Sequence, residues 1–221
     1  WLFCIPGHFS LLLCVFLIWN VLAGSVKLPV SEILEILRGR GDGTQSRILL
    51  QIRLPRLLSA LILGGALSVS GYLLQTFFHN PIAGPFVLGI SSGAKLCVSI
   101  VMILLLSRGL VSSSAVLIAA AFVGAMGSMG FVLAVSQKVK RMSMLVICGV
   151  MIGYICTAAT DLLVTFADDS NIVNLHNWSM GSFSGMSWEN VGTMAIVCGA
   201  ALILVFFLSK PIRAYQLGEV Y

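Results

Sequence analysis

Charged residues are scarce in this sequence, and their scarcity excludes a large class of proteins. Only 10% of the 221 residues are charged, whereas a soluble globular domain has about a quarter. Hydrophobic residues make up 58% of the chain, and its mean hydropathy is +1.03. The net charge of +5 is spread over the loops rather than clustered, which argues against a nucleic-acid partner. The composition is that of a membrane protein.

Motifs for nucleotide, metal or catalytic chemistry are also missing. The chain contains no Walker A pattern, so it does not bind nucleotide phosphates by that device. Its six cysteines show no C-x-x-C or metal-ligand spacing and lie in apolar surroundings, which predicts buried thiols. The segment GISSG, residues 89–93, matches G-x-S-x-G, but none of the three histidines is placed to assist a nucleophile there. We therefore expect neither enzymatic activity nor a metal or cofactor bound by this chain.

Long apolar runs, in contrast, are abundant. Crossing a membrane takes about 20 mostly apolar residues, and six stretches are long enough. They cover roughly residues 9–24, 56–77, 86–106, 111–135, 143–167 and 191–209. Small residues recur four apart within them, which lets helix backbones approach closely in lipid. The sequence predicts an all-α fold, a polytopic membrane bundle with six transmembrane helices.

Two connections carry local signals. In PVSEILEILRG, residues 29–39, Ser31 as N-cap and Gly39 after the last turn predict a short helix. Its apolar side would rest on the membrane surface or on the bundle. In HNPIAGP, residues 79–85, two prolines and a glycine predict that the second apolar helix ends near Phe78. Pro85 then suits the first turn of the next helix.

Two ionisable residues lie inside apolar stretches. Lys95 is about halfway along the third stretch, and Asp161 is about two-thirds of the way along the fifth. A charge at such a depth costs at least about 2.5 kcal/mol on insertion, so it marks a pathway or a partner, or else faces water without a specific role. An ion pair between the two residues is a further hypothesis.

Two arginines stand at the start of the second stretch, in QIRLPRLL, residues 51–58. Pro55 at the first helical position would leave Arg53 in extended backbone and Arg56 in the first turn. Two guanidiniums beside the free N–H groups of a helix start predict an anion site. The anion would be a lipid phosphate or an acidic side chain of a partner protein, and the residues alone favour neither.

Residues 52–94 closely resemble the signature region of the FecCD-type permeases, the membrane subunits of bacterial ABC importers for iron–siderophores, haem and cobalamin. The resemblance includes R-L-P-R, S-G-x-x-x-Q, N-P-[LI]-A and L-G-I-S-x-G-A. Three later segments also resemble the family: residues 145–158, the external segment NWSMGSFSGMSW at 177–188, and LGEVY at 217–221. The resemblance therefore covers essentially the whole chain.

The resemblance implies an architecture and a set of partners. It implies a permease with ten transmembrane helices, of which residues 1–221 hold six in a single domain truncated at its C-terminal end. It implies a second permease subunit, two ATPase subunits that bind ATP, and an extracytoplasmic substrate-binding protein. The N-terminus would be cytoplasmic in a bacterial cytoplasmic membrane, although counting loop cations mildly favours the opposite orientation.

The resemblance also assigns residues. Arg53 and Arg56, in R-L-P-R, would bind glutamate side chains of the binding protein. The motif positions that shape the break between the second and third helices are Gln75, Asn80, Pro81 and Gly89. Gly218 and Glu219 would begin the element that couples to the ATPase. Asp161 and Lys95 are candidates for lining the passage.

The predicted function is therefore transport. The chain is expected to be the permease subunit of a binding-protein-dependent ABC importer for an iron chelate, haem or cobalamin, and to interact with membrane lipids. An alternative is a secondary transporter driven by an ion gradient, with Asp161 as its proton or cation site.

Overall fold

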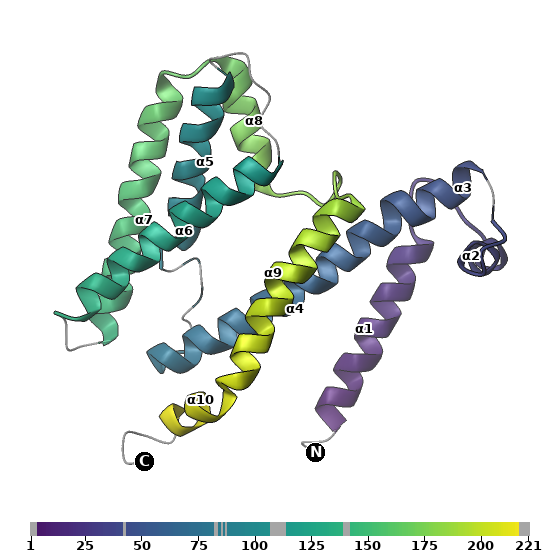
Figure 1. The fold of residues 1–221 in the computed structure, drawn as a ribbon, viewed down its shortest axis with the longest axis horizontal. Coiled ribbons are helices and arrows are strands. Elements are labelled where there is room, and N and C mark those ends of the chain that lie inside the picture. Colours follow the sequence, from purple (N-terminus) through teal and green to yellow (C-terminus); the bar gives the residue numbers. More distant parts are fainter. Residues whose placement is uncertain are drawn as a thin grey trace. The chain divides into compact units, whose positions relative to one another are not determined.

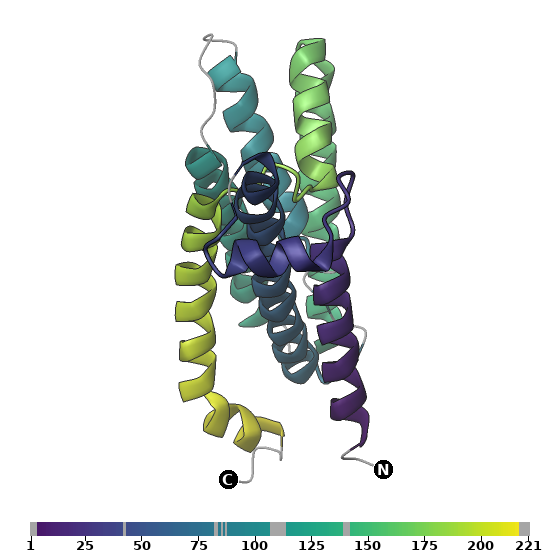
Figure 2. The ribbon, with the colours of Figure 1, turned by 90° about the vertical axis from the view of Figure 1, so that its right-hand side faces the viewer.

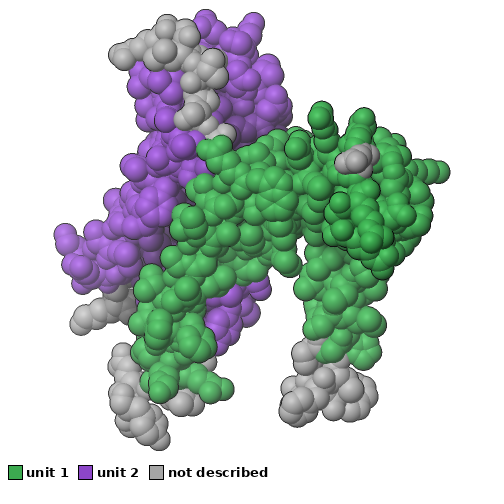
Figure 3. Space-filling view, turned by 45° about the vertical axis from the view of Figure 1, so that its right-hand side comes forward, with its two compact units in different colours: residues 1–67, 183–221 green, residues 68–182 purple. Residues whose placement is uncertain are grey.

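The computed structural model of the chain describes residues 4–41, 43–81, 84, 86, 88–106, 114–138 and 142–216 (Figure 1; Figure 2). Regular structure in these ranges is helical, as predicted. The chain forms two compact units: residues 1–67 with 183–221, and residues 68–182 (Figure 3). The boundary at residue 67 falls within the helix α4, Leu54–Phe78.

The six predicted apolar stretches are all helices, with ends within a few residues of those expected. They are α1 (Cys4–Leu22), α4 (Leu54–Phe78), α5 (Ile90–Leu106), α6 (Ser114–Ser136), α7 (Met142–Thr165) and α9 (Trp188–Phe207). Four helical segments are long and apolar enough to cross a membrane: Thr44–Phe78, Ala115–Ser136, Met144–Thr165 and Trp188–Phe207. Gly7–Leu22 and Ile90–Leu105 are shorter apolar helices.

The start of α4 differs from the prediction. A short helix α3 (Thr44–Arg47) runs into a π-helical segment, η1 (Ile48–Arg53), which leads directly into α4. Pro55 is therefore inside a continuous helix and not at its first position. The wider turn of a π-helix, with i→i+5 hydrogen bonds, accommodates a residue that cannot donate a backbone hydrogen bond. Arg53 is itself helical, as the last residue of η1, so the prediction of extended backbone there is wrong.

A small apolar core lies in the first unit, where α1 ends. Its buried residues are Leu28, Ile33, Ile36 and Leu49. They bring together the loop after α1, the short helix α2 (Val30–Leu37), and η1. Figure 2 shows α2 lying crosswise to α1.

The ends of α2 are set by backbone chemistry. The predicted N-cap Ser31 is wrong, because the N-cap is Pro29, two residues earlier, and it makes no side-chain hydrogen bond. At the other end, Gly39 has a positive φ of 77° and its N–H bonds the carbonyl of Ile36, while Arg40 N–H bonds that of Glu35. This is a Schellman motif, for which glycine is favoured.

The second unit is a bundle of α5, α6, α7 and α8 (Asp169–Met180), with α6, α7 and α8 all packing against α5. Val98 and Met102 of α5 pack with Ala120 of α6 and Leu175 of α8 in one core cluster. The helix α8 was not predicted, because its residues are mostly polar and only Asn171 and Leu175 are buried. A second cluster joins Phe78, Leu88 and Leu145.

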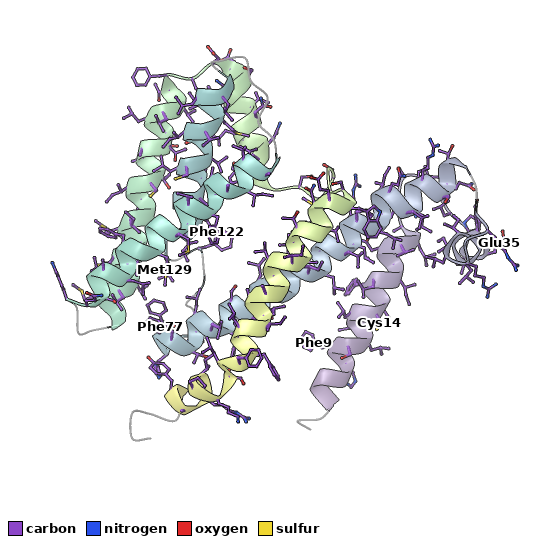
Figure 4. All side chains as sticks on the ribbon, in the orientation of Figure 1. Phe9, Cys14, Glu35, Phe77, Phe122 and Met129 are labelled. Atoms are coloured by element: carbon purple, nitrogen blue, oxygen red, sulfur yellow. The ribbon has the colours of Figure 1, made fainter. Side chains whose placement is uncertain are left out.

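Apolar side chains cover the outside of the helices (Figure 4). Phe9 on α1 is 71% exposed within the chain, as expected for a surface that faces lipid. The prediction of buried thiols is confirmed for Cys156 and wrong for Cys14, which is exposed on α1. A thiol behaves as a small apolar group, so the lipid-facing side of a helix accommodates it.

Candidate functional site

The guanidinium of Arg53 lies at the C-terminal end of α1, and only 8% of this residue is exposed. Its Nη1 donates hydrogen bonds to the carbonyl oxygens of Val21, at 2.6 Å, and Leu22, at 3.4 Å. Its Nη2 donates to the carbonyl oxygen of Val26 in the loop after α1. The last carbonyls of a helix lack helical partners and carry partial negative charge, so a cation there is favourable. Arg53 is a C-terminal cap of α1.

Gly24 makes room for this cap. A Cβ at position 24 would collide with Nη2 of Arg53 and would lie 2.8 Å from its Cζ. Any side chain there would push the guanidinium away from the three carbonyls. Gly24 and Arg53 therefore form one structural unit, although they are far apart in the sequence.

The anion site predicted at the start of α4 does not form as expected. Because the helix continues from Thr44 through η1, residues 53–56 offer no free helix-start N–H groups. The two arginines also have different surroundings. Arg53 is enclosed by backbone carbonyls, whereas Arg56 is half-buried.

Arg56 contacts the loop before α9. Its Nη2 donates a hydrogen bond of 2.7 Å to the carbonyl oxygen of Ser184. Its Nε is buried and has no hydrogen-bond partner within the described structure. A guanidinium has five N–H donors, so Arg56 keeps donors for a further acceptor. Ser184, in the part of the expected external segment that belongs to the first unit, thus contacts the arginine motif.

A second contact between these parts follows from Pro55. The N–H of Leu54 bonds the carbonyl of Leu49 in the π register, so the next bond would run from residue 55 to Leu50. Proline has no N–H to donate. The carbonyl of Leu50 instead accepts a 2.8 Å hydrogen bond from Nε1 of Trp188, the first residue of α9.

The family-motif residues of the break act largely through the backbone. Asn80 N–H bonds the carbonyl of Gln75, and His79 N–H bonds that of Thr76, so the end of α4 has the hydrogen bonds of a Schellman motif. His79 takes the left-handed position, with φ of 48°, where glycine is usual. Pro81 is exposed in the turn that follows.

Gly89 is the motif residue with the tightest surroundings. It has φ of 69°, and a Cβ there would lie 2.7 Å from the carbonyl oxygen of Gly149 and from the nitrogen of Gly153 on α7. Both conditions require glycine. Small residues four apart on α7 let the start of α5 approach, as predicted from their spacing.

Asp161 and Lys95 lie on neighbouring helices but are not paired. Asp161 is exposed on α7 and Lys95 is half-buried on α5. No ion pair joins them in the part of the chain that the structure describes, so the hypothesis of an ion pair between the two residues is not supported. Asp161 shares its face of α7 with Tyr154, Thr157 and Thr165, all exposed. This polar stripe runs along a helix that is long enough to cross a membrane.

The remaining sequence predictions concern the C-terminal motif residues and metal binding. Gly218 and Glu219 lie outside the described residues. Within the described ranges, no three His, Cys, Asp or Glu side chains are grouped to hold a metal ion. The sequence-based reasoning did not identify Gly24, Ser184 or Trp188, because each acts through a contact with a residue far away in the sequence.

The FecCD transport family model matches residues 12–221. The vitamin B12 import system permease protein BtuC of Klebsiella pneumoniae is 34% identical over 220 residues, which cover 100% of this chain and 62% of that protein. The hemin transport system permease protein HmuU of Yersinia pestis is 32% identical over 173 residues, covering 78% of this chain and 52% of its own length.

A solved structure agrees with the fold. A metal-chelate type ABC transporter in an inward-facing conformation superposes with a TM-score of 0.80 at 26% identity. The match covers 97% of this chain and 65% of the other. The chain thus spans less than two thirds of the length of these relatives.

Proposed function

Because the chain belongs to the FecCD transport family, we propose that it is part of the membrane permease of a binding-protein-dependent ABC importer. The family match over residues 12–221 carries this proposal. Relatives named for vitamin B12 and hemin import, and a structural relative named for metal chelates, support cobalamin or an iron chelate such as haem as the substrate. Residues 1–221 would form one transmembrane permease domain in a bacterial cytoplasmic membrane, with a cytoplasmic N-terminus.

The chemistry of ATP would belong to partner subunits. In this proposal a second permease subunit completes the passage, two ATPase subunits bind and hydrolyse ATP, and the segment with Gly218 and Glu219 leads toward them. The chain itself catalyses no bond chemistry and binds no cofactor. It supplies a passage whose inward-open and outward-open states are biased by the partners.

Arg56 would contact the binding protein. It is half-buried and uses one nitrogen on the Ser184 carbonyl, so the remaining donors can bind a carboxylate of a partner. Arg53 would assist indirectly, because its donors on Nη1 and Nη2 already serve three carbonyls of the chain. The docking role predicted for both arginines is thus assigned to Arg56, with Arg53 as a positioning residue.

Asp161 would line the passage. A charged side chain on a membrane-spanning helix faces protein or water, because facing lipid is costly. Its stripe with Tyr154, Thr157 and Thr165 is exposed in the single chain, as a passage wall completed by another subunit would be. Lys95 on α5 is the second candidate for this wall.

Uptake experiments test the proposal. The full-length gene would be expressed with its ATPase and binding protein, and entry of labelled cobalamin, haem and an iron–siderophore would be measured. We expect uptake of at least one label that disappears when the ATPase cannot hydrolyse ATP. Uptake that survives loss of the ATPase but stops with an uncoupler would instead indicate the secondary transporter with Asp161 as ion site.

Docking is tested separately by charge reversal. Arg56→Glu should weaken binding of the binding protein by at least about tenfold, which corresponds to about 1.4 kcal/mol. Arg47→Glu, an exposed change on α3, is the matched control and should have a smaller effect. Recovery of binding when an acidic residue of the binding protein is changed to lysine would support the assignment. Unchanged affinity in Arg56→Glu would overturn it.

A further inference from the structure

The short helix α2 has an apolar stripe that the chain leaves uncovered. Val30, Leu34 and Leu37 are 58%, 46% and 57% exposed. Their spacing of four and three residues puts them in one line along the helix. Three large apolar side chains on one exposed line of an eight-residue helix need an apolar environment outside the chain.

The rest of α2 is divided between protein and water. Ile33 and Ile36 are buried in the core at the end of α1. The polar residues Ser31, Glu32 and Glu35 occupy a third side. At about 100° per residue, the uncovered stripe lies roughly 100° from the buried side and roughly 140° from the polar side. The helix therefore has one side for protein, one for water, and one apolar side facing nearly away from the water.

Two tryptophans mark the membrane interface close to α2. Trp19 lies three residues before the end of α1 and is 68% exposed. Trp188 is the first residue of α9, and its indole binds the Leu50 carbonyl of η1, next to Leu49 of the α2 core. Tryptophan concentrates where a membrane helix meets the headgroup region. Both residues place that region at the level where α1 ends and α2 packs.

The orientation of α2 fits the same level. Figure 2 shows α2 crosswise to α1, as a helix in the plane of a membrane surface would lie beside a spanning helix. Exposed cations stand at both of its ends, Lys27 before it and Arg38 and Arg40 after it. Lysine and arginine at such positions reach lipid phosphates while their apolar stems stay near the acyl chains.

From this geometry we infer that α2 is an interfacial helix whose stripe of Val30, Leu34 and Leu37 is inserted among membrane lipids. The bilayer, continuous with the lipid around α1, covers this stripe, and the surface of another protein does not. Ile33 and Ile36 attach the helix to the chain, and Glu32 and Glu35 face water. The inference depends on membrane insertion of the chain and not on the substrate that it transports.

Site-specific photo-crosslinking tests this inference. The full-length permease, assembled with its ATPase and binding protein, would carry p-benzoyl-phenylalanine at position 34 or at position 35. Position 35 is the matched control, since Glu35, labelled in Figure 4, is exposed on the polar side. After illumination in vesicles of phosphatidylethanolamine and phosphatidylglycerol, adducts would be identified by mass spectrometry. Both variants should elute as folded, assembled complexes.

We expect at least fivefold more lipid adduct at position 34 than at position 35. A protein adduct at position 34 would overturn the inference and identify a partner that covers the stripe. Equal lipid adduct at both positions would also overturn it, because the stripe would then share the environment of the polar side.

Discussion

At the scale of single residues, the carbonyls of Val21, Leu22 and Val26 explain why Arg53 is buried beside the apolar helix α1. Carbonyls at a helix C-terminus carry partial negative charge, and near lipid little water is present to satisfy them. The guanidinium satisfies three of them at once. Removing Arg53, or blocking its approach with a side chain at position 24, would leave partly buried acceptors without these donors, which costs more than the hydrogen bonds themselves.

Gly24→Ala and Arg53→Ala should therefore have the same consequence. Each should lower the free energy of unfolding by about 2–3 kcal/mol, as expected when hydrogen bonds from a charged group are lost. The double mutant should be no less stable than the worse single mutant, because both changes remove one interaction. The measurement is unfolding in mixed micelles followed by circular dichroism.

Gly185→Ala is the control for this cycle, because a Cβ at Gly185 would meet no atom of the described residues within 4 Å. It should change stability by less than about 0.5 kcal/mol. Additive losses in the double mutant would show that Gly24 and Arg53 act independently and would contradict the cap.

At the scale of elements, η1 and Pro55 create an acceptor that another element must satisfy. The indole of Trp188 donates to the Leu50 carbonyl, so the start of α9 is attached to η1. Trp188→Phe keeps the aromatic ring and removes this donor. It should cost about 1 kcal/mol of stability and increase amide exchange in residues 181–187, measured by hydrogen exchange. Trp19→Phe, on exposed α1, should leave exchange in this loop unchanged.

The packing of α5 on α6 depends on the absence of side chains. A Cβ at Gly93 would collide with Oγ of Ser128 and would lie 2.6 Å from the carbonyl oxygen of Gly124. Gly93→Ala should lower stability by about 1–3 kcal/mol, the usual cost of overpacking. Gly127→Ala on α6 should be close to neutral, because no described atom outside its own helical turn lies within 4 Å of the added Cβ. Thermal unfolding in detergent compares the two, and equal melting temperatures would exclude the close approach.

The sequence predicts elements better than contacts, for a physical reason. Hydropathy locates the six apolar helices, because a long run of apolar residues can be recognised wherever its neighbours in the fold lie. The continuation of the helix through Pro55 could not be predicted, since proline is over-represented at the first position of a helix. The helix α8 was missed because its stability depends on packing against α5 and not on its own composition.

The candidate site was predictable only in part. The R-L-P-R motif identified Arg53 and Arg56 as special, but the sequence does not place the end of α1 or Gly24 beside Arg53. The resemblance also selected Gln75, Asn80, Pro81 and Gly89 as positions that shape the break. The backbone hydrogen bond between Asn80 and Gln75 and the close approach at Gly89 depend on the folded chain and do not follow from the motif.

At the scale of the whole molecule, the chain leaves much of its apolar surface for other partners to cover. Only 6% of the most apolar window is buried inside the chain in each of the helical segments Thr44–Phe78 and Trp188–Phe207. Lipid or other protein surfaces would cover the rest. Exposure in the single chain therefore does not distinguish a lipid-facing residue from a passage-lining one, whereas charge does.

Asp161 is the residue for which this distinction can be tested. Asp161→Thr keeps a polar side chain on the stripe of α7 and removes its charge. If Asp161 lines the passage, uptake of a charged iron chelate relative to cobalamin should change by at least about threefold, because wall charge acts differently on differently charged substrates. Leu162→Val, an exposed apolar neighbour, should leave this ratio unchanged. Equal reduction for every substrate, at equal protein abundance, would show that the carboxylate supports assembly and does not select what passes.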